Sequence, residues 1–171
     1  MHTFVSYIKS RELHFLYQIN QNIKCSILDK LMTFITHFGS FPAIMLILLV
    51  LLKSSDPGLV RVGQALAAVQ VVSQIAVHSL KWIVNRPRPF KVWKDIIARH
   101  PPTSKHSFPS GQTCAIFATA LTIASFYPTS AFILIPLALI VGISRIYLGA
   151  HYPTDVLVGC FLAIGTWLIV L

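Results

Sequence analysis

The stretch Ser144-Arg145-Ile146-Tyr147-Leu148-Gly149-Ala150-His151-Tyr152-Pro153-Thr154-Asp155 lies between two long apolar runs and decides how the C-terminal half of the chain folds. Arg, His and Asp side chains this close to hydrocarbon are energetically unfavourable, and in membrane segments they usually mark a functional site. Pro153 suits the first position of a helix, where its missing N–H has no partner to lose. We therefore expect one helix to end before His151 and the next to begin at Pro153.

The same stretch brings an imidazole, a carboxylate and a guanidinium together. Asp155 would lie one turn from His151, where a carboxylate can hold one ring nitrogen and leave the other free to act on a substrate. Arg145, at the end of the preceding helix, presents the fork of donors that suits a phosphate group. Alone, the stretch is also compatible with a purely structural, salt-linked turn between two helices.

The composition indicates a membrane protein. The chain has 171 residues, of which 55% are hydrophobic and only 11% are charged, and its mean hydropathy is +0.71. A chain of this length is typically one domain, and this composition predicts that lipid surrounds most of it. We expect a single all-α domain over residues 1–171, folded as a polytopic membrane helix bundle. The cysteines, Cys25, Cys114 and Cys160, have neither the number nor the spacing of a disulfide framework or a metal site.

The chain divides into a polar and an apolar part. Residues 1–38 hold two amphipathic stretches, 3–22 and 26–37, which are too polar to span and are predicted to lie as helices in the membrane interface. Residues 39–171 are predicted to form the spanning bundle, with the active-site loop over 85–109. The first span must borrow residues from Phe38 onward, because its apolar run is short. The expected spans are 38–52, 59–84, 110–127, 131–148 and 153–171.

Positive charge is concentrated in one loop. Seven of the 14 Lys and Arg residues fall between Lys81 and Lys105, where only Asp95 opposes them. Such a loop suits anionic membrane lipids, nucleic acid or a phosphorylated substrate; nucleic acid is disfavoured because so hydrophobic a chain has little soluble surface. Connectivity places this loop and the hinge 149–152 at the same membrane face. A Lys and Arg bias would put that face in the cytoplasm, but the rule weakens where the charges serve a ligand.

Three clusters meet at this face. The first is Lys81 with Arg88, which lies in a rigid turn between two prolines. The second is Ser110 followed by Gly111, a helix N-cap and a glycine that lets an anion approach free backbone N–H groups. The third is the opening stretch. Each cluster alone is common, but together they predict a phosphate site that contains a nucleophile.

These clusters resemble the signature motifs of the type 2 phosphatidic acid phosphatase family, whose active site is similar to that of vanadium haloperoxidases. The first motif, Lys, six residues, Arg-Pro, is matched by Lys81 and Arg88-Pro89. The third, Ser-Arg, five residues, His, three residues, Asp, is matched in full from Ser144 to Asp155. The second, Pro-Ser-Gly-His, is matched at 109–111, but Gln112 stands where the family has His.

The resemblance implies a lipid phosphatase that works without a metal or another cofactor. His151 would attack phosphorus and form a phosphohistidine, with Asp155 orienting its ring. Fixed cations and a helix N-terminus would stabilise the charge that grows in the transition state. The phosphoryl oxygens would be bound by Lys81, Arg88, Ser110, Gly111 and Arg145. The sequence also shows no carboxylate cluster of the kind that holds Mg²⁺.

Gln112 puts proton transfer in question. In the family this His protonates the leaving oxygen and then activates a water, whereas Gln cannot exchange a proton near neutral pH. Loss of a general acid typically costs about 10²–10⁴-fold in rate. Three explanations stay open: an introduced change that inactivates an enzyme, a natural variant that binds without turnover, or an enzyme that recruits His106 or water. His78 is otherwise expected to be a packed polar group, and His100 and His106 surface residues.

The expected substrate is undecaprenyl diphosphate, converted to undecaprenyl phosphate in a bacterial plasma membrane with the site facing outward, where wall synthesis releases this carrier. Phosphatidylglycerol phosphate and phosphatidic acid are alternatives. A non-catalytic protein that binds or transports lipid phosphates is the second class, and Gln112 favours it if natural. A vanadate-dependent peroxidase is disfavoured, because those proteins are soluble. The expected partners are a lipid phosphate and membrane lipids; the sequence predicts no oligomeric state.

Overall fold

The computed structural model describes residues 2–102 and 104–171, and all of its regular structure in these ranges is helical. This confirms the all-α bundle. The elements are α1 (His2–Tyr17), η1 (Gln18–Asn22), α2 (Ser26–Thr36), η2 (His37–Gly39), α3 (Phe41–Leu52), α4 (Pro57–Val84), α5 (Pro89–Val92), α6 (Gly111–Phe126), η3 (Pro128–Ser130), α7 (Ala131–Tyr147) and α8 (Pro153–Val170).

Among the described residues, three segments are long and apolar enough to cross a membrane: α4, η3 with α7, and α8. A fourth candidate is the pair α2 and α3, which passes only as a unit and is bent by 49° at the break between them. The predicted span 110–127 is α6, whose 16 residues extend only about 24 Å. That is shorter than a hydrocarbon core of roughly 30 Å.

The short helix α6 is the centre of the bundle and contacts α4, α7 and α8. Its buried positions are mostly small, including Cys114, Ala118 and Ala120. Close approach is required at Gly159 of α8, where an added Cβ would lie 2.7 Å from the carbonyl oxygen of Ser110. Because protein surrounds α6, it does not need the length that a lipid-facing span needs.

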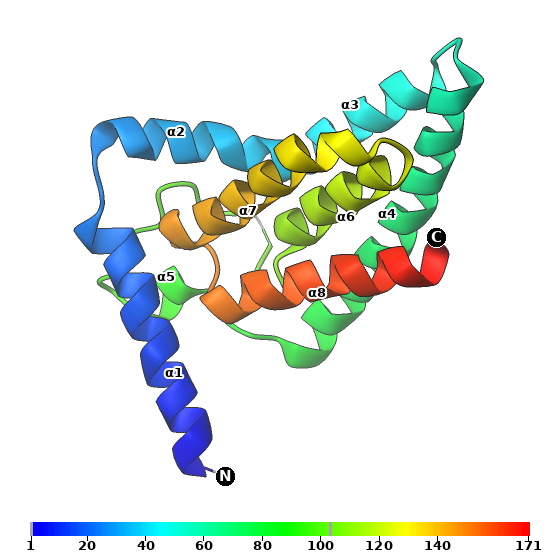
Figure 1. The fold of residues 1–171 in the computed structure, drawn as a ribbon. Coiled ribbons are helices and arrows are strands. Elements are labelled where there is room, and N and C mark those ends of the chain that lie inside the picture. The colour runs from blue at the N-terminus through cyan, green and yellow to red at the C-terminus, as the bar shows by residue number, and fades with distance from the viewer. Residues whose placement is uncertain (1, 103) are drawn as a thin grey trace.

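The second amphipathic stretch packs against the bundle. Residues 26–37, which were predicted to lie in the interface, contain α2, and α2 contacts α7 and runs beside it (Figure 1). Its acidic residue, Asp29, is bound by protein: the Tyr147 hydroxyl donates to it at 2.5 Å, and Arg99 forms an ion pair with it at 2.8 Å. These bonds satisfy the polar group that made the stretch look interfacial. By contrast, α1 leaves one end of the bundle at a steep angle to α7 and α8 (Figure 1).

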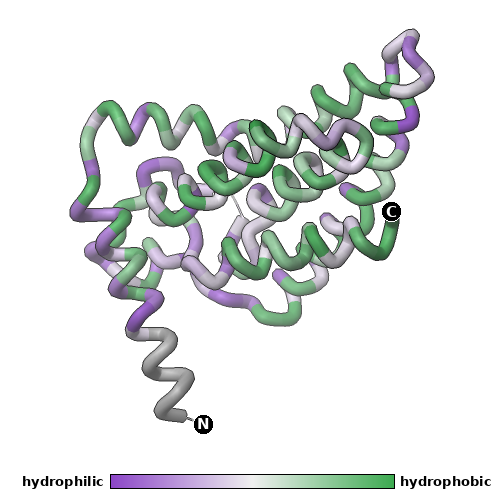
Figure 2. Tube along the Cα trace, in the orientation of Figure 1, coloured by the Kyte–Doolittle hydropathy of each residue, from purple (hydrophilic) through white to green (hydrophobic). Residues whose placement is uncertain are grey.

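The outer surface of the bundle is apolar. Large side chains on the spanning helices are strongly exposed, for example Trp82 (82%), Phe132 (84%) and Ile169 (81%). Such surfaces are unfavourable in water but suit lipid. In Figure 2 the hydrophobic colour follows the helices, and hydrophilic residues gather in the α3–α4 turn and at the end that carries α5. The protein is therefore an integral membrane protein with helical spans.

Candidate active site

The predicted convergence of distant segments occurs at one end of the bundle. α5 and the α7–α8 connection lie together at this end, whereas the α3–α4 and α6–α7 turns lie at the opposite end (Figure 1). The basic loop is held in place by a bridge between Pro87 and His106. Sequence segments from four helices and this loop thus contribute side chains to one region.

A pocket of about 320 Å³ opens here. Three cations line it, Lys81, Arg88 and Arg145, together with His151 and Gln112. No carboxylate lies on its wall in the part of the chain that the structure describes. A pocket with three cations and no acid suits an anion with several oxygens, such as a phosphoryl group.

The two nitrogens of His151 face different partners. Nε2 lies 3.2 Å from Nη1 of Arg88, and Nδ1 lies 3.5 Å from Oδ2 of Asp155. Because a guanidinium only donates, Nε2 is the unprotonated nitrogen and Nδ1 carries the proton toward the carboxylate. The lone pair of Nε2 therefore faces Arg88, and both residues line the pocket.

Burial is the main cause that lowers the pKa of His151 to about 3; the nearby cations Arg145 and Arg88 act in the same direction, and the Asp155 carboxylate opposes them. His151 is thus neutral at neutral pH in the unliganded protein. Neutrality keeps the attacking lone pair available.

The carboxylate of Asp155 is fully buried and its oxygens are divided between partners. Oδ1 accepts from Arg86 Nη1 at 2.8 Å, and Oδ2 accepts from the backbone N–H of Tyr152 at 2.9 Å. The second bond is part of a capping box that starts α8. Arg86 lies outside the motif positions, and the sequence analysis assigned it no role.

The turn that carries His151 depends on one glycine. Gly149 has a φ of +70°, and an added Cβ there would lie 2.5 Å from the carbonyl oxygen of Ile97. The backbone N–H groups of Ala150 and His151 both donate to the carbonyl of Arg145, at 3.1 and 3.2 Å. The hinge is therefore a closed turn with a defined direction for the imidazole.

Arg88 is held by the chain itself. It donates to the carbonyl of Ala150 at 2.8 Å, and to the carbonyl and hydroxyl of Ser104 at 2.8 and 2.7 Å. Burial lowers its pKa to about 10, with Asp155 opposing the shift, so it remains a cation at neutral pH. A fixed cation 3.2 Å from Nε2 of His151 suits an anionic group bound beside this nitrogen.

Gln112 and Arg145 are linked through a residue that sequence reasoning missed. The hydroxyl of Thr36 accepts from Arg145 Nη1 at 2.6 Å and donates to Gln112 Oε1 at 3.1 Å. Thr36 ends α2, so this helix reaches the site. No sequence signal identified it, because a threonine near a helix end is common.

Two buried polar atoms at the pocket have no hydrogen-bond partner among the described residues. They are Gln74 Nε2 and Arg145 Nε, and both residues line the pocket. Buried polar atoms are rarely left unpaired, so unpaired donors on one pocket wall indicate an acceptor-rich ligand. His78 also lines the pocket, unlike His100 and His106.

The remaining predicted ligands differ in how they face the pocket. Lys81 lines it and donates to the carbonyl of His106 at 3.4 Å. Gly111 forms part of the wall at the start of α6. The Ser110 hydroxyl is buried and accepts from the Thr113 hydroxyl at 2.8 Å, so it caps its own helix. Ser110 therefore supports the helix start, while Gly111 offers the backbone.

The start of α6 packs beside α4, about two turns before α4 ends. An added Cβ on Gly111 would lie 3.5 Å from Val77, and α4 continues to Val84, about 10 Å further. The phosphate pocket is therefore recessed between helices. Within the described ranges no three His, Cys, Asp or Glu side chains are grouped to hold a metal ion.

An apolar groove continues from the pocket. A cavity of about 460 Å³ between α3 and α4 is lined by Met45, Leu48, Leu49, Leu52 and Val71 among others. It shares Phe41, Ile44, Gln70 and Gln74 with the phosphate pocket. The two cavities thus adjoin, the polar one suited to a head group and the apolar one to a hydrocarbon tail.

Comparison with known proteins gives a consistent picture. The model of the PAP2 superfamily matches residues 59–171. An undecaprenyl-diphosphatase from Sulfolobus acidocaldarius is 28% identical over 154 residues, which cover 88% of this chain and 71% of that protein. Two further relatives, the lipid A 1-phosphatases of Rhizobium etli and Rhizobium johnstonii, are 33% identical to this chain. Both are longer, and the match covers 47% and 44% of their lengths.

Two solved structures have the same fold. The crystal structure of LpxE from Aquifex aeolicus superposes with a TM-score of 0.82 at 29% identity, covering 92% of each chain. The crystal structure of a transmembrane PAP2-type phosphatidylglycerolphosphate phosphatase from Bacillus subtilis gives a TM-score of 0.73 at 27% identity, covering 96% of this chain and 84% of that one.

Proposed function

Because the chain belongs to the PAP2 superfamily and is therefore a hydrolase of lipid phosphates in the membrane, we propose that it converts undecaprenyl diphosphate to undecaprenyl phosphate through a phosphohistidine at His151. The observation that carries the mechanism is the placement of Nε2 of His151 beside Arg88, on the wall of a pocket with three cations.

The chemistry follows from the geometry. Nε2 of His151 attacks the terminal phosphorus, and the bond from that phosphorus to the bridging oxygen breaks, so undecaprenyl phosphate leaves. The Asp155 carboxylate stabilises the imidazolium through Nδ1. Lys81, Arg88, Arg145 and the Gly111 N–H hold the equatorial oxygens. Water then attacks the phosphohistidine, which releases inorganic phosphate and restores the neutral imidazole. These cations supply the charge stabilisation that a metal ion supplies elsewhere.

The groove supports a lipid with a long tail. The apolar cavity between α3 and α4 adjoins the phosphate pocket, and its walls are almost entirely aliphatic and aromatic. A polyprenyl chain in this groove would bring its diphosphate to His151. The relative named undecaprenyl-diphosphatase, which matches over most of this chain, also favours this substrate.

Gln112 reduces the rate in this proposal. Gln112 lies on the pocket wall, and its Oε1 accepts a hydrogen bond from the Thr36 hydroxyl. An amide cannot deliver the proton that the leaving oxygen needs. The bridging oxygen of a diphosphate leaves as a phosphate, a better leaving group than the alkoxide of a monoester. We expect a diphosphate substrate to suffer less from Gln112 than phosphatidic acid does.

A phosphatidylglycerol phosphate phosphatase is the second candidate, and the similar structure from Bacillus subtilis favours it. A lipid-phosphate receptor without turnover is the third, since the cations remain while the proton donor is missing. Residues 1–171 act as one domain in all three, and as one phosphatase domain in the first two. We place the protein in a bacterial plasma membrane with the pocket facing outward, because the diphosphate carrier is released there.

The test is phosphate release by detergent-solubilised protein and by its Gln112→His variant, with undecaprenyl diphosphate, phosphatidylglycerol phosphate and phosphatidic acid. We expect the variant to be about 10²–10⁴-fold faster in kcat, with undecaprenyl diphosphate turned over best by both. The Thr36→Val variant is the control, because it removes the hydroxyl that orients residue 112 without adding a proton donor. Binding of all three lipids with no release by either form would show a receptor.

A further inference from the structure

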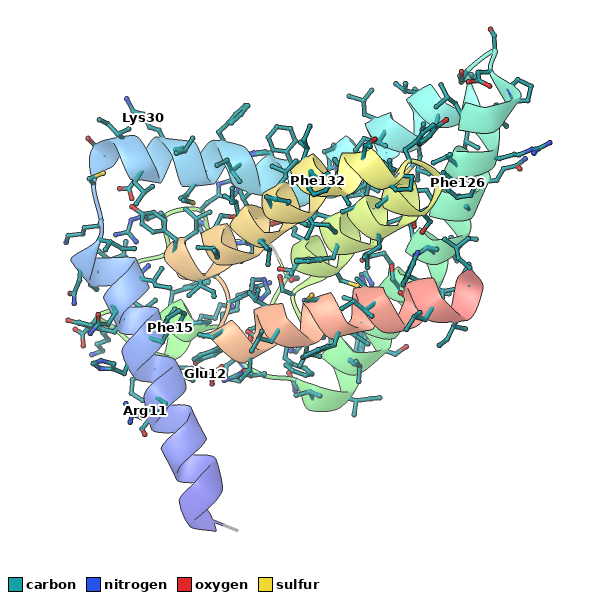
Figure 3. All side chains as sticks on the ribbon, viewed as in Figure 1. Arg11, Glu12, Phe15, Lys30, Phe126 and Phe132 are labelled. Atoms are coloured by element: carbon teal, nitrogen blue, oxygen red, sulfur yellow. The ribbon has the colours of Figure 1, made fainter. Side chains whose placement is uncertain are left out.

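The only glutamate of the chain, Glu12, lies on α1 and outside every motif. Figure 3 shows it beside the start of α8. Its carboxylate is buried, and both oxygens are used: Oε1 accepts from the backbone N–H of Thr154 at 3.0 Å and from the Thr154 hydroxyl, and Oε2 accepts from Arg86 at 2.7 Å. A buried carboxylate with partners on both oxygens is a fixed group and differs from a solvated surface charge.

Arg86 connects this carboxylate to Asp155. Its Nη1 donates to Oδ1 of Asp155 and to the Thr154 hydroxyl, each at 2.8 Å, and its guanidinium lies 3.7 Å from the centre of the Tyr152 ring. Burial alone would lower the pKa of Arg86, but the bonds to Glu12 and Asp155 outweigh burial and raise it. Arg86 is therefore a permanent cation shared by two carboxylates.

The sharing affects the nucleophile. Oδ1 of Asp155 is engaged by Arg86, and Oδ2 faces Nδ1 of His151 at 3.5 Å. If Arg86 were paired with Asp155 alone, its positive charge would weaken the electrostatic interaction between the Asp155 carboxylate and the imidazole. Glu12 takes up part of the charge of Arg86 and also holds Thr154, the neighbour of Asp155. The Asp155 carboxylate therefore keeps its orientation and its electrostatic attraction for the His151 imidazole.

We propose that Glu12 is a positioning residue for the nucleophile: through Arg86 and Thr154 it holds Asp155 in the orientation that aligns His151. Glu12 is absent from the described lining of the phosphate pocket, so it acts on the chemical step and leaves substrate binding unchanged. This inference rests on the proposed function, since it concerns the same phosphoryl transfer.

The test is a double-mutant cycle with Glu12→Gln, Arg86→Gln and the pair, measured as kcat and KM in the parent and in the Gln112→His background. We expect Glu12→Gln to lower kcat by roughly 10–100-fold, the loss typical when a group that orients a functional histidine is removed. KM should stay constant. The double variant should be no slower than Arg86→Gln alone, because both changes break one chain of contacts.

Leu16→Ala is the matched control, because Leu16 is buried on the same helix against Ile146 and Tyr152 and carries no charge. It should lower the melting temperature while keeping kcat near the parent value. Unchanged kcat in Glu12→Gln, a rise in KM alone, or losses that multiply in the double variant would overturn the inference while the phosphatase activity stands. If neither parent hydrolyses any lipid phosphate, the proposed function fails and this inference with it.

Discussion

Residues 144–155 and residues 12–20 both hold the turn that carries His151, but they do so in different ways. The first segment supplies two groups that line the pocket, Arg145 and His151, and these occur at fixed spacing along the chain. The second supplies Glu12 and Asn20, which contact the turn from outside and are separated from it by more than a hundred residues. Groups that touch a substrate are recognisable as motifs, whereas groups that hold them in place are distributed over the fold.

Asn20 shows the same arrangement on the other side of the turn. It is fully buried, donates to the carbonyls of Tyr147 and Ile97 at 2.8 and 3.0 Å, and accepts from the N–H of Ile97 at 3.0 Å. It therefore ties the end of α7 to the basic loop. Together Glu12 and Asn20 make the N-terminal segment part of the site.

The sharpest test of the motif segment is Asp155→Asn. An amide would leave the geometry nearly intact but would no longer stabilise the imidazolium, so we expect hydrolysis to fall by about 10⁴-fold while binding of the lipid phosphate persists. Phosphate release and lipid binding are measured on the same preparation. Asp56→Asn, at the helix cap of α4 at the other end of the bundle, is the control and should keep full activity. Equal turnover in Asp155→Asn would remove the His151–Asp155 pair from the mechanism.

Arg145→Ala tests one of the buried cations of the pocket. If Arg145 binds the phosphoryl group as proposed, loss of its charge should weaken inhibition by inorganic phosphate by roughly 10–100-fold. The remaining affinity should also depend less on salt than in the parent, because one cation fewer attracts the anion. Inhibition constants are measured over a range of NaCl concentrations. Arg61→Ala, exposed near the opposite end, is the control, and an equal loss in both variants would argue for a general charge effect.

Asn20→Ala tests the N-terminal segment and should have the smallest effect on the reaction. It removes the bond to the carbonyl of Tyr147 and both bonds to the backbone of Ile97, so we expect the free energy of unfolding to fall by about 1–3 kcal/mol. Thermal unfolding in detergent measures this change. Gln18→Ala removes an exposed amide of the same segment that bonds only to His14 among the described residues and should be neutral. Equal stability of the two variants would show that the segment does not support the turn.

The sequence predicted the parts of the site that depend on local spacing. The motifs and the connectivity of the helices predicted that these side chains meet, and one pocket is indeed lined by Lys81, Arg88, Gln112, Arg145 and His151. Their catalytic roles stay predictions. The turn itself was also predictable, because Pro153 and the helix that follows it set the position of Asp155.

The missed residues depend on long-range contacts. Glu12 meets Arg86 across 74 residues, and Thr36 meets Arg145 across 109. A single sequence carries no sign of such pairs, since a glutamate on an amphipathic helix and a threonine at a helix end fit a surface position equally well. The same limit applies to the contacts of α2, where Tyr147 and Arg99 bind Asp29.

The bounds of α6 agree with the predicted segment 110–127 to within one residue at each end. Its central place among α4, α7 and α8 was not predictable, because hydropathy does not distinguish a helix that faces lipid from one that faces other helices.

The bonds between Glu12 and Thr154 join residues that are 142 positions apart. During synthesis α1 leaves the ribosome before α8, so the two carboxylates around Arg86 meet only after both helices have been made. The contacts that hold Asp155 beside His151 are therefore completed late, when the N-terminal segment and α8 have come together.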